Sequence, residues 1–324
     1  MKFLVTGGLG FIGQCVVRNL LQRGIPSVSA DRIADAEAIA VLSEAGARAN
    51  TSFDAMSMDV SDFRDVMSAF HKHPEISHVI HLAYVMGPLV DENTSLSTRV
   101  NILGMTNMFE AAVHHGLARL VFTSSETVYG PSQKTYGDRP VVETDFCDPA
   151  SHTFTYAVMK LLNEHMGRRY VERYAADIVC TRPPVVFGHG RKRSAVMWAE
   201  HFASQPAVGE TAKLPFGPET RDTWIYKDDC AEQLVRLALK PKLAHFAYNS
   251  GGQCVSAAEI AAFVRRWIPD ARFEFDTTRA GTPLIDNEDG TRLIREIDFT
   301  PRPLELGVRA HINEARLAAL LPPV

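Results

Sequence analysis

The chain opens with Met1-Lys2-Phe3-Leu4-Val5-Thr6-Gly7-Gly8-Leu9-Gly10-Phe11-Ile12-Gly13. Phe3–Val5 predicts a short apolar strand, and the residues from about Phe11 to Gln22 predict a helix. The turn between them contains glycines with the spacing G-x-x-G-x-x-G, at Gly7, Gly10 and Gly13. A strand, a glycine turn and a helix in this order predict the first unit of a parallel α/β sheet.

Each glycine of this turn meets a different steric requirement. Gly7 permits the sharp turn after the strand, Gly10 lets the backbone approach a diphosphate, and Gly13 lets the helix pack closely on the strand. The first helical turn, with Phe11 and Ile12, offers N–H groups and a partial positive charge to the same anion. The turn therefore predicts a dinucleotide site, although ordinary βαβ turns can share the pattern.

An acidic residue ends the next predicted strand. Asp31 closes Ser27–Asp31, eighteen residues beyond Gly13. A carboxylate at this place accepts hydrogen bonds from both hydroxyls of an adenosine ribose and repels a 2′-phosphate, so we expect NAD rather than NADP. Arg32 argues the other way, because a guanidinium beside the ribose can bind a 2′-phosphate.

The composition excludes several classes of protein. A chain of 324 residues with 46% hydrophobic residues can build one large or two unequal domains. The net charge of −4 provides no basic face for nucleic acid. No apolar run reaches the ~18 residues of a membrane span, and no secretory signal pattern is recognisable. The five scattered cysteines lack C-x-x-C spacing, so we expect a cytoplasmic protein without disulfides or zinc.

Strand and helix patterns alternate through the first two-thirds of the chain. His78–Ala83 predicts a buried strand with almost no polar alternation, as is typical of parallel sheets, and Arg119–Ser125 predicts the next strand. Long helices are predicted over Thr94–His115 and Tyr156–Tyr174. The pattern predicts an α/β fold with a doubly wound parallel (Rossmann) sheet.

The alternation breaks after Gly188. We therefore assign 1–187 to a dinucleotide-binding domain, with returns to its sheet at about 222–250. Residues 188–324 form mainly a smaller C-terminal α/β lobe for the substrate. The part before about Asp229, rich in proline and glycine, is expected to be irregular.

Tyr156 and Lys160 lie four residues apart on a predicted helix and share one face. A nearby ammonium group favours the phenolate of a tyrosine and makes it a general base for a hydroxyl proton. Such pairs are common on helix surfaces, so this pair indicates a catalytic site only in combination with residues upstream of it. Thr123 and Ser125 end a buried strand, where hydroxyls reach the switch point of the sheet. Local hydrogen bonding to the backbone is the alternative for these hydroxyls.

With these residues the chain resembles the extended short-chain dehydrogenase/reductases, also called the NAD-dependent epimerase/dehydratase family. The resemblance extends from Met1 to about Leu239. It rests on Thr6–Gly13, Asp31, Asp59-Val60, His81-Leu82-Ala83, Asn101–Asn107, Ser124–Gly130, Tyr156-x-x-x-Lys160, Arg182–Gly188 and Arg221–Asp229.

The resemblance implies a role for each matching residue. Ser125 corresponds to the catalytic hydroxyl, Tyr156 to the catalytic base, and Lys160 to the lysine that binds the nicotinamide ribose and lowers the tyrosine pKa. Asn101 corresponds to a catalytic asparagine on the long helix near the active site. Further cofactor contacts are implied for Asp59, Val60, Leu82, Ala83, Tyr84, Thr123, Pro183, Val185 and Val186. The two long helices correspond to those that commonly form a four-helix homodimer interface.

Departures from the family pattern bear on the substrate. Nucleotide-sugar members usually have an asparagine where this chain has Val185, which cannot hydrogen-bond a diphosphate. Sugar 4,6-dehydratases have a glutamate base where this chain has Thr127, whose hydroxyl is too weak a base for α-proton abstraction. Glu126 can accept hydrogen bonds from a polyol or sugar, or else it is a rim carboxylate that faces solvent.

Several charged residues are compatible with more than one class of substrate. Arg221 matches an arginine that grips a phosphate in nucleotide-sugar members, but the same residue also occurs in other members. Arg191-Lys192-Arg193 can form an anion-binding lip, with Arg191 as the candidate substrate contact, or can be a solvated loop. His81, His152 and His189 lack metal-ligand spacing, so we predict no metal site.

The sequence thus predicts an NAD-dependent oxidoreductase that transfers hydride from or to a secondary alcohol carbon of a sugar-like or other polar small molecule. An NAD-dependent epimerase of a sugar or nucleotide sugar is the first alternative. A non-catalytic NAD-binding sensor is the second, and the complete set of Ser125, Tyr156 and Lys160 argues against it.

Overall fold

The computed structural model of the chain describes residues 1–192, 194, 196–279, 281 and 283–324. Within these ranges every helix is too short or too polar to cross a bilayer. The chain divides into two units. The first contains Met1–Ser124, Phe154–Arg182 and Ala231–Tyr248, and the second contains Ser125–Thr153, Pro183–Cys230 and Asn249–Val324. Relative to the predicted boundary at residue 187, the second unit also includes 125–153 and 183–187.

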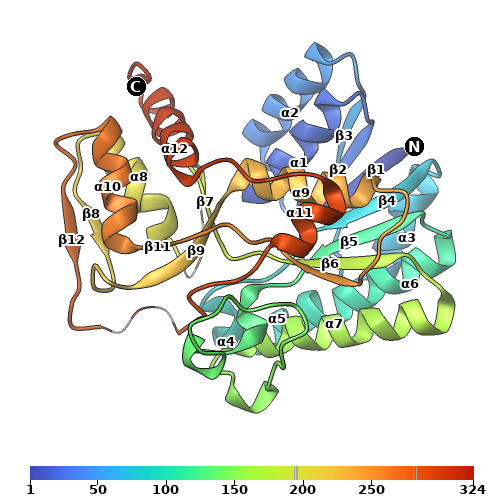
Figure 1. Cartoon of the computed structure of the whole chain (residues 1–324). Coiled ribbons are helices and arrows are strands. Elements are labelled where there is room, and N and C mark those ends of the chain that lie inside the picture. The colour runs from blue at the N-terminus through green and yellow to red at the C-terminus, as the bar shows by residue number, and fades with distance from the viewer. Residues whose placement is uncertain (193, 195, 280, 282) are drawn as a thin grey trace. The chain divides into compact units, whose positions relative to one another are not determined.

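A seven-stranded sheet forms the centre of the first unit, in the order β10-β6-β5-β4-β1-β2-β3 (Figure 1). Its strands are β1 (Lys2–Thr6), β2 (Ser27–Asp31), β3 (Phe53–Ser57), β4 (Ile76–His81), β5 (Arg119–Thr123), β6 (Ile178–Arg182) and β10 (Ala247–Asn249). Neighbouring strands from β6 to β3 are parallel. The strand order reverses between β1 and β4, where α/β proteins of this type bind ligands. The predicted doubly wound sheet is confirmed.

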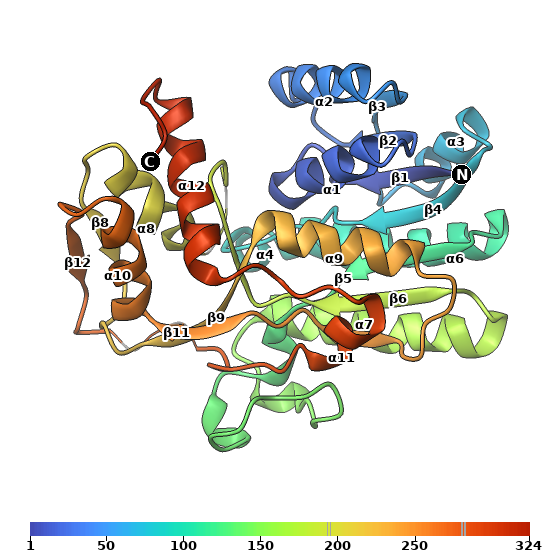
Figure 2. The ribbon, with the colours of Figure 1, turned by 45° about the horizontal axis from the view of Figure 1, so that its top comes forward.

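Helices cover both faces of this sheet, as Figures 1 and 2 show. They are α1 (Phe11–Gln22), α2 (Ala36–Arg48), α3 (Phe63–Lys72), α6 (Met105–His115), α7 (Thr155–Tyr174) and α9 (Lys227–Leu239). From one face, α3, α6 and α7 pack Phe70, Phe109 and Met166 into a common core with Phe122 of β5. On the other face, α1 and α2 lie side by side.

The predicted long helix Thr94–His115 is helical throughout but changes its winding. It consists of α5 (Thr94–Thr98), a π-helical turn (Arg99–Gly104) and α6, and a short helix, α4 (Leu89–Glu92), precedes it. π-helical turns are rare and occur frequently at functional sites. This one contains Asn101, a residue that the sequence singled out.

The second unit is an α/β structure with its own core. It has a three-stranded sheet, β11-β9-β7, and a two-stranded sheet, β12-β8. Its elements are β7 (Val185–Phe187), α8 (Trp198–Ala207), β8 (Ala212–Leu214), β9 (Arg221–Tyr226), β11 (Gln253–Ser256), α10 (Ala257–Trp267), β12 (Phe273–Phe275), α11 (Thr291–Ile297) and α12 (Leu304–Ala318). The expectation of irregular structure before Asp229 is wrong for α8 and β9, because Phe202 and Trp224 anchor them in this core.

Candidate active site

The glycine turn joins β1 to α1 with very little free space. Gly7 has a φ of +69°, and a Cβ there would lie 2.9 Å from the backbone of Leu82 and Ala83. A Cβ on Gly13 would lie 2.1 Å from the Gly7 carbonyl oxygen. Among the described residues, Gly10 at the N-cap of α1 provides no side-chain cap and the first turn has no acidic residue, which suits the approach of an anion to this positive helix end. The turn fits the diphosphate of a dinucleotide.

Asp31 ends β2 and is tied to the glycine turn. Its Oδ2 accepts hydrogen bonds from the Leu9 N–H (2.9 Å) and the Ser29 hydroxyl (3.1 Å). Burial raises the pKa of Asp31 to about 6, against the lowering effect of these hydrogen bonds. The carboxylate keeps lone pairs for ribose hydroxyls. Arg32, which follows it, is exposed.

The ends of β3, β1 and β4 carry further predicted cofactor residues. After β3, Asp59 Oδ1 accepts hydrogen bonds from the Ser61 N–H (2.9 Å) and hydroxyl (2.7 Å), while Val60 is buried. Burial raises the pKa of Asp59, but the Ser61 hydrogen bonds and nearby arginines outweigh it and lower the pKa overall. After β4, the amides of Leu82-Ala83 lie 3.3 Å from the Thr6 hydroxyl at the end of β1.

Tyr156 and Lys160 lie on α7 and meet Tyr84, which follows β4. The rings of Tyr84 and Tyr156 pack edge to face with 5.5 Å between centroids. Nζ of Lys160 lies 3.4 Å from the Tyr84 ring centroid and donates to the Thr123 carbonyl at 2.6 Å. Lys160 is only 2% exposed, and this burial lowers its pKa to about 7. Residues predicted for catalysis and for cofactor binding therefore surround one buried amine.

Two asparagines hold Tyr84 and its neighbours in place. Asn101 accepts from the Val85 N–H (2.7 Å) and donates to the Val85 carbonyl (3.0 Å). Asn163 donates to the Asn101 carbonyl (3.0 Å) and to the Tyr84 hydroxyl (3.2 Å). Our sequence analysis did not identify Asn163, although its position three residues after Lys160 places it on the same face of α7.

A buried ion pair ties α7 to the ends of β5 and β6. Arg182 donates to both carboxylate oxygens of Glu164, at 2.8 and 2.7 Å. Ser124 donates to the same carboxylate at 2.6 Å. Burial opposes ionisation of Glu164, yet the contacts with Arg182 and Ser124 lower its pKa overall. We did not predict Glu164, which lies one helical turn after Lys160.

Ser125 and Glu126 belong to the second unit. Ser125 caps a short 3₁₀-helix, and its hydroxyl oxygen accepts from the Thr127 N–H at 3.2 Å. Glu126 is 4% exposed, so the alternative of a rim carboxylate in solvent is wrong. Burial raises the pKa of Glu126 well above its ordinary value, and the charges of Glu288 and Asp222 add to this effect.

The segment that starts at Pro183 leads into β7. The Pro183 carbonyl accepts from the Glu126 N–H at 3.1 Å. Val185 and Val186 are buried, and β7 pairs in parallel with β9. The Arg191 guanidinium hydrogen-bonds the Val186 carbonyl and donates to the Ser194 hydroxyl at 3.1 Å. Arg191 is thus held against β7.

Arg221, at the start of β9, is exposed, and its guanidinium contacts other residues of the second unit. It donates to the Cys254 carbonyl at 3.0 Å and lies 3.4 Å from Oε2 of Glu259. These contacts suit a structural role and leave part of the guanidinium open to an anion. Arg193, the last member of the predicted anion-binding lip, lies outside the described residues.

Comparisons with known proteins identify one family and several related enzymes. A profile of the NAD dependent epimerase/dehydratase family matches residues 3–251. L-threonine 3-dehydrogenase, mitochondrial, of Bos taurus is 24% identical over 291 residues, which cover 88% of this chain and 74% of that protein. D-erythronate dehydrogenase of Cupriavidus necator is 31% identical over 233 residues, 68% of this chain and 66% of that protein. UDP-glucose 4-epimerase of Thermus thermophilus, crystallised with NAD, has a TM-score of 0.77 and 24% identity, with 98% of this chain and 99% of that chain covered.

Proposed function

The chain belongs to the NAD-dependent epimerase/dehydratase family, and from this premise we propose that it is a dehydrogenase that oxidises a secondary alcohol of a small, sugar-like molecule. Membership makes it an enzyme of the extended short-chain dehydrogenase/reductase type, which sets aside the non-catalytic sensor. The observation that carries the proposal is the buried Lys160, held by the Thr123 carbonyl and the Tyr84 ring on the same helix face as Tyr156.

In the proposed reaction Tyr156 is the general base. NAD, when bound, accepts the hydride from the alcohol carbon. The Tyr156 oxygen takes the hydroxyl proton, so that the alcohol becomes a ketone. The positive charge of Lys160 stabilises the tyrosine phenolate, and Ser125 donates a hydrogen bond to the substrate oxygen. Asn101 is a positioning residue in this scheme, because its amide is engaged by the backbone of Val85.

We further propose NAD rather than NADP as the cofactor. In this scheme the glycine turn and the N-terminus of α1 hold the diphosphate. Asp31, anchored by the Leu9 N–H, accepts the ribose hydroxyls. With a pKa of about 6 it is mostly ionised at neutral pH, and its charge disfavours a 2′-phosphate.

A free sugar acid or polyol is the proposed substrate class, which would assign the enzyme to carbohydrate metabolism. Val185 is apolar and 4% exposed, so it offers no hydrogen bond to a nucleotide diphosphate. The relative D-erythronate dehydrogenase is named for a sugar acid. A nucleotide-sugar epimerase is the second candidate, and the exposed Arg221 favours it, because a guanidinium can bind a diphosphate.

We also propose a homodimer in the cytoplasm. Leu103, Val158 and Leu162 lie on the two long helices and are 46%, 39% and 43% exposed. These apolar side chains support the four-helix interface that the family resemblance implies. None of the five cysteines, all within the described residues, forms a disulfide, which suits a reducing compartment.

Replacing Tyr156 by phenylalanine tests the mechanism. NADH formation with a panel of sugar acids and polyols should fall by roughly 10²–10⁴-fold, because the base is gone. NAD affinity, measured by fluorescence titration, should change little. Unchanged turnover in the variant would refute the role of Tyr156.

A thermal-shift screen of the NAD-loaded protein tests the substrate class. Ligands that bind the folded state raise its melting temperature by mass action. Shifts with sugar acids or polyols support the dehydrogenase. Shifts with UDP- or dTDP-sugars alone would instead favour the epimerase and make Arg221 the next residue to substitute.

A further inference from the structure

Three side chains that commonly bind metal ions meet in the second unit, and none has a role in the proposed hydride transfer. They are His189, which follows β7, Glu200 on α8 and His311 on α12. We propose that these three side chains bind a divalent transition-metal ion such as Zn²⁺. The expectation that His81, His152 and His189 are not metal ligands rested on sequence spacing, whereas the fold brings together residues far apart in the chain.

The distances suit a tetrahedral ion. His189 Nδ1 lies 3.2 Å from Glu200 Oε1, and all three candidate ligand atoms lie within 4.8 Å of one another. Ligands that are ~2.0–2.1 Å from a tetrahedral Zn²⁺ are roughly 3.3–3.5 Å apart. One pair already has nearly this separation. Two imidazoles and one carboxylate are ligands that zinc and iron(II) accept, whereas Mg²⁺ and Ca²⁺ prefer oxygen ligands alone.

Packing holds the His311 imidazole in place, and a hydrogen bond holds the backbone of His189. His311 is fully buried, stacked on Phe187 (6.1 Å between centroids, 27°) and edge to face with Phe202 (5.4 Å, 89°). His189 lies between two glycines with positive φ, and its carbonyl accepts from Lys227 at 2.8 Å. A site whose ligands are already oriented loses little conformational entropy when the ion binds.

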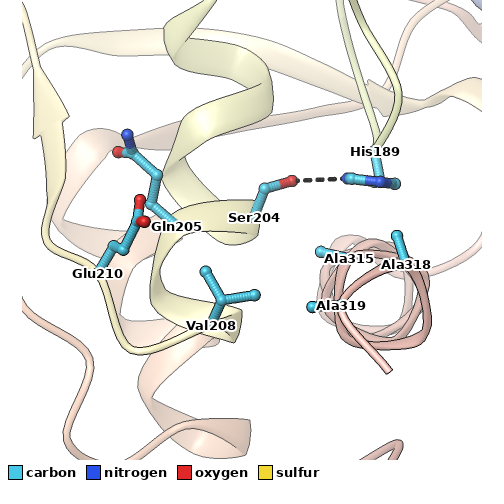
Figure 3. A pocket seen from close by; sticks show the side chains of 8 residues that line it. All are labelled: His189, Ser204, Gln205, Val208, Glu210, Ala315, Ala318 and Ala319. Carbon is cyan, nitrogen blue, oxygen red and sulfur yellow. Dashed lines mark hydrogen bonds between the residues drawn. The ribbon is translucent and has the colours of Figure 1, made fainter. Parts of the chain in front are cut away.

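A surface pocket reaches the cluster at His189. It has a volume of about 310 Å³, and His189 and Ser204 line it together with residues at the end of α12. Figure 3 shows His189 and Ser204 joined by a hydrogen bond at its edge, with the small side chains of Ala315 and Ala318 opposite α8. An ion can enter here and keep a water molecule as its fourth ligand.

The same atoms also form a hydrogen-bond network without metal. The Ser204 hydroxyl lies 3.1 Å from His189 Nδ1 and 2.8 Å from His311 Nε2, and it donates to Glu200. One hydroxyl hydrogen and two lone pairs can serve these three neighbours. The two possibilities differ in what they require. The network depends on the Ser204 hydroxyl, whereas metal binding depends on the imidazoles.

Zinc titration of the tag-free, chelator-treated full chain tests the proposal. Isothermal titration calorimetry should show one Zn²⁺ per chain, and Co²⁺ should give the ligand-field absorption of a tetrahedral site. His189→Ala and His311→Gln should each weaken Zn²⁺ binding by at least ~100-fold, since even loss of an outer-shell partner typically weakens it ~10–100-fold. Ser204→Ala should retain binding.

The control variant is His201→Ala. His201 is adjacent to Glu200 but 40% exposed, and its Nε2 lies 3.8 Å from the other Glu200 oxygen. It should bind Zn²⁺ like the wild type. If His311→Gln does not fold, His189→Ala decides the question, because His189 is 31% exposed. Absence of stoichiometric binding to the wild type, or equal binding by His189→Ala, would overturn the proposal.

Discussion

Replacing Lys160 by methionine should stabilise the protein at neutral pH while it removes activity. Burial lowers the pKa of Lys160 from its ordinary value of 10.5 to about 7. At a pH between these two pKa values, Lys160 is protonated in the unfolded chain and mostly neutral in the folded chain. Stability rises with pH wherever the unfolded state binds more protons. The wild type therefore loses stability as the pH falls from about 10.5 towards about 7, and a methionine at this position does not.

The size of the effect follows from the two pKa values. At about 1.4 kcal/mol per pH unit, the difference corresponds to roughly 4–5 kcal/mol at pH 7. Methionine also loses the hydrogen bond of Lys160 to the Thr123 carbonyl, which contributes about 1–2 kcal/mol. The contact of Nζ with the Tyr84 ring contributes about 0.5–2 kcal/mol more. The expected net gain at pH 7 is therefore centred on about 2 kcal/mol and reaches at most about 3.5 kcal/mol, and it should vanish or change sign near pH 10.

Urea unfolding of the cofactor-free protein, followed by circular dichroism between pH 7 and 10, measures this difference. The advantage of Lys160→Met should shrink by about 1 kcal/mol or more per pH unit through the middle of this range. Lys72→Met is the matched control, because Lys72 is exposed on α3 and should show no such trend. A difference between Lys160→Met and the wild type that does not depend on pH would refute the reasoning. Turnover by Lys160→Met should fall by ~10²-fold or more.

Asp31→Ser should raise the preference for NADP over NAD in kcat/KM by roughly 10–100-fold, because it removes the charge that repels a 2′-phosphate; an unchanged ratio would contradict the assigned role. Arg182→Met should destabilise the protein by about 3–5 kcal/mol in urea unfolding, since it leaves the Glu164 carboxylate buried without its cation. The double variant Glu164→Leu/Arg182→Met should recover most of this loss, and additive losses would argue against a coupled pair. Gly13→Ala places a methyl group 2.1 Å from the Gly7 carbonyl oxygen, so NAD binding by fluorescence titration and the melting temperature should both fall; normal NAD affinity would contradict close packing of the turn.

Local patterns were sufficient to predict the first unit. The apolar Phe3–Val5 and the glycines after it specify a strand and a turn through neighbours in the sequence alone. His78–Ala83 shows almost no alternation of polar and apolar residues, as is typical of a strand with two covered faces. Such features do not depend on what the rest of the chain does, so the parallel sheet and its order of elements could be predicted.

The second unit was harder because its elements are short and depend on distant partners. Trp198–Ala207 includes Pro206, which argued against a helix, but Pro206 lies one residue before the end of α8. At that position it disturbs only the last turn. Arg221–Tyr226 is a strand because its side chains pack between other elements of the unit, which no local pattern reveals.

Burial of the polar face of α7 depends on the rest of the fold, so the sequence did not show it, and only Tyr156 and Lys160 were predicted as site residues on this helix. Its buried positions include Lys160, Asn163 and Glu164, so this face of the helix is polar and nevertheless covered. Burying an amine, an amide and a carboxylate destabilises a fold unless each finds a partner. The partners come from elsewhere: Tyr84 after β4, the Asn101 carbonyl, and the strand ends. For Lys160 these partners do not offset the cost of burying the charge, as its lowered pKa indicates. Loss of that charge should therefore stabilise the protein at neutral pH while it removes activity.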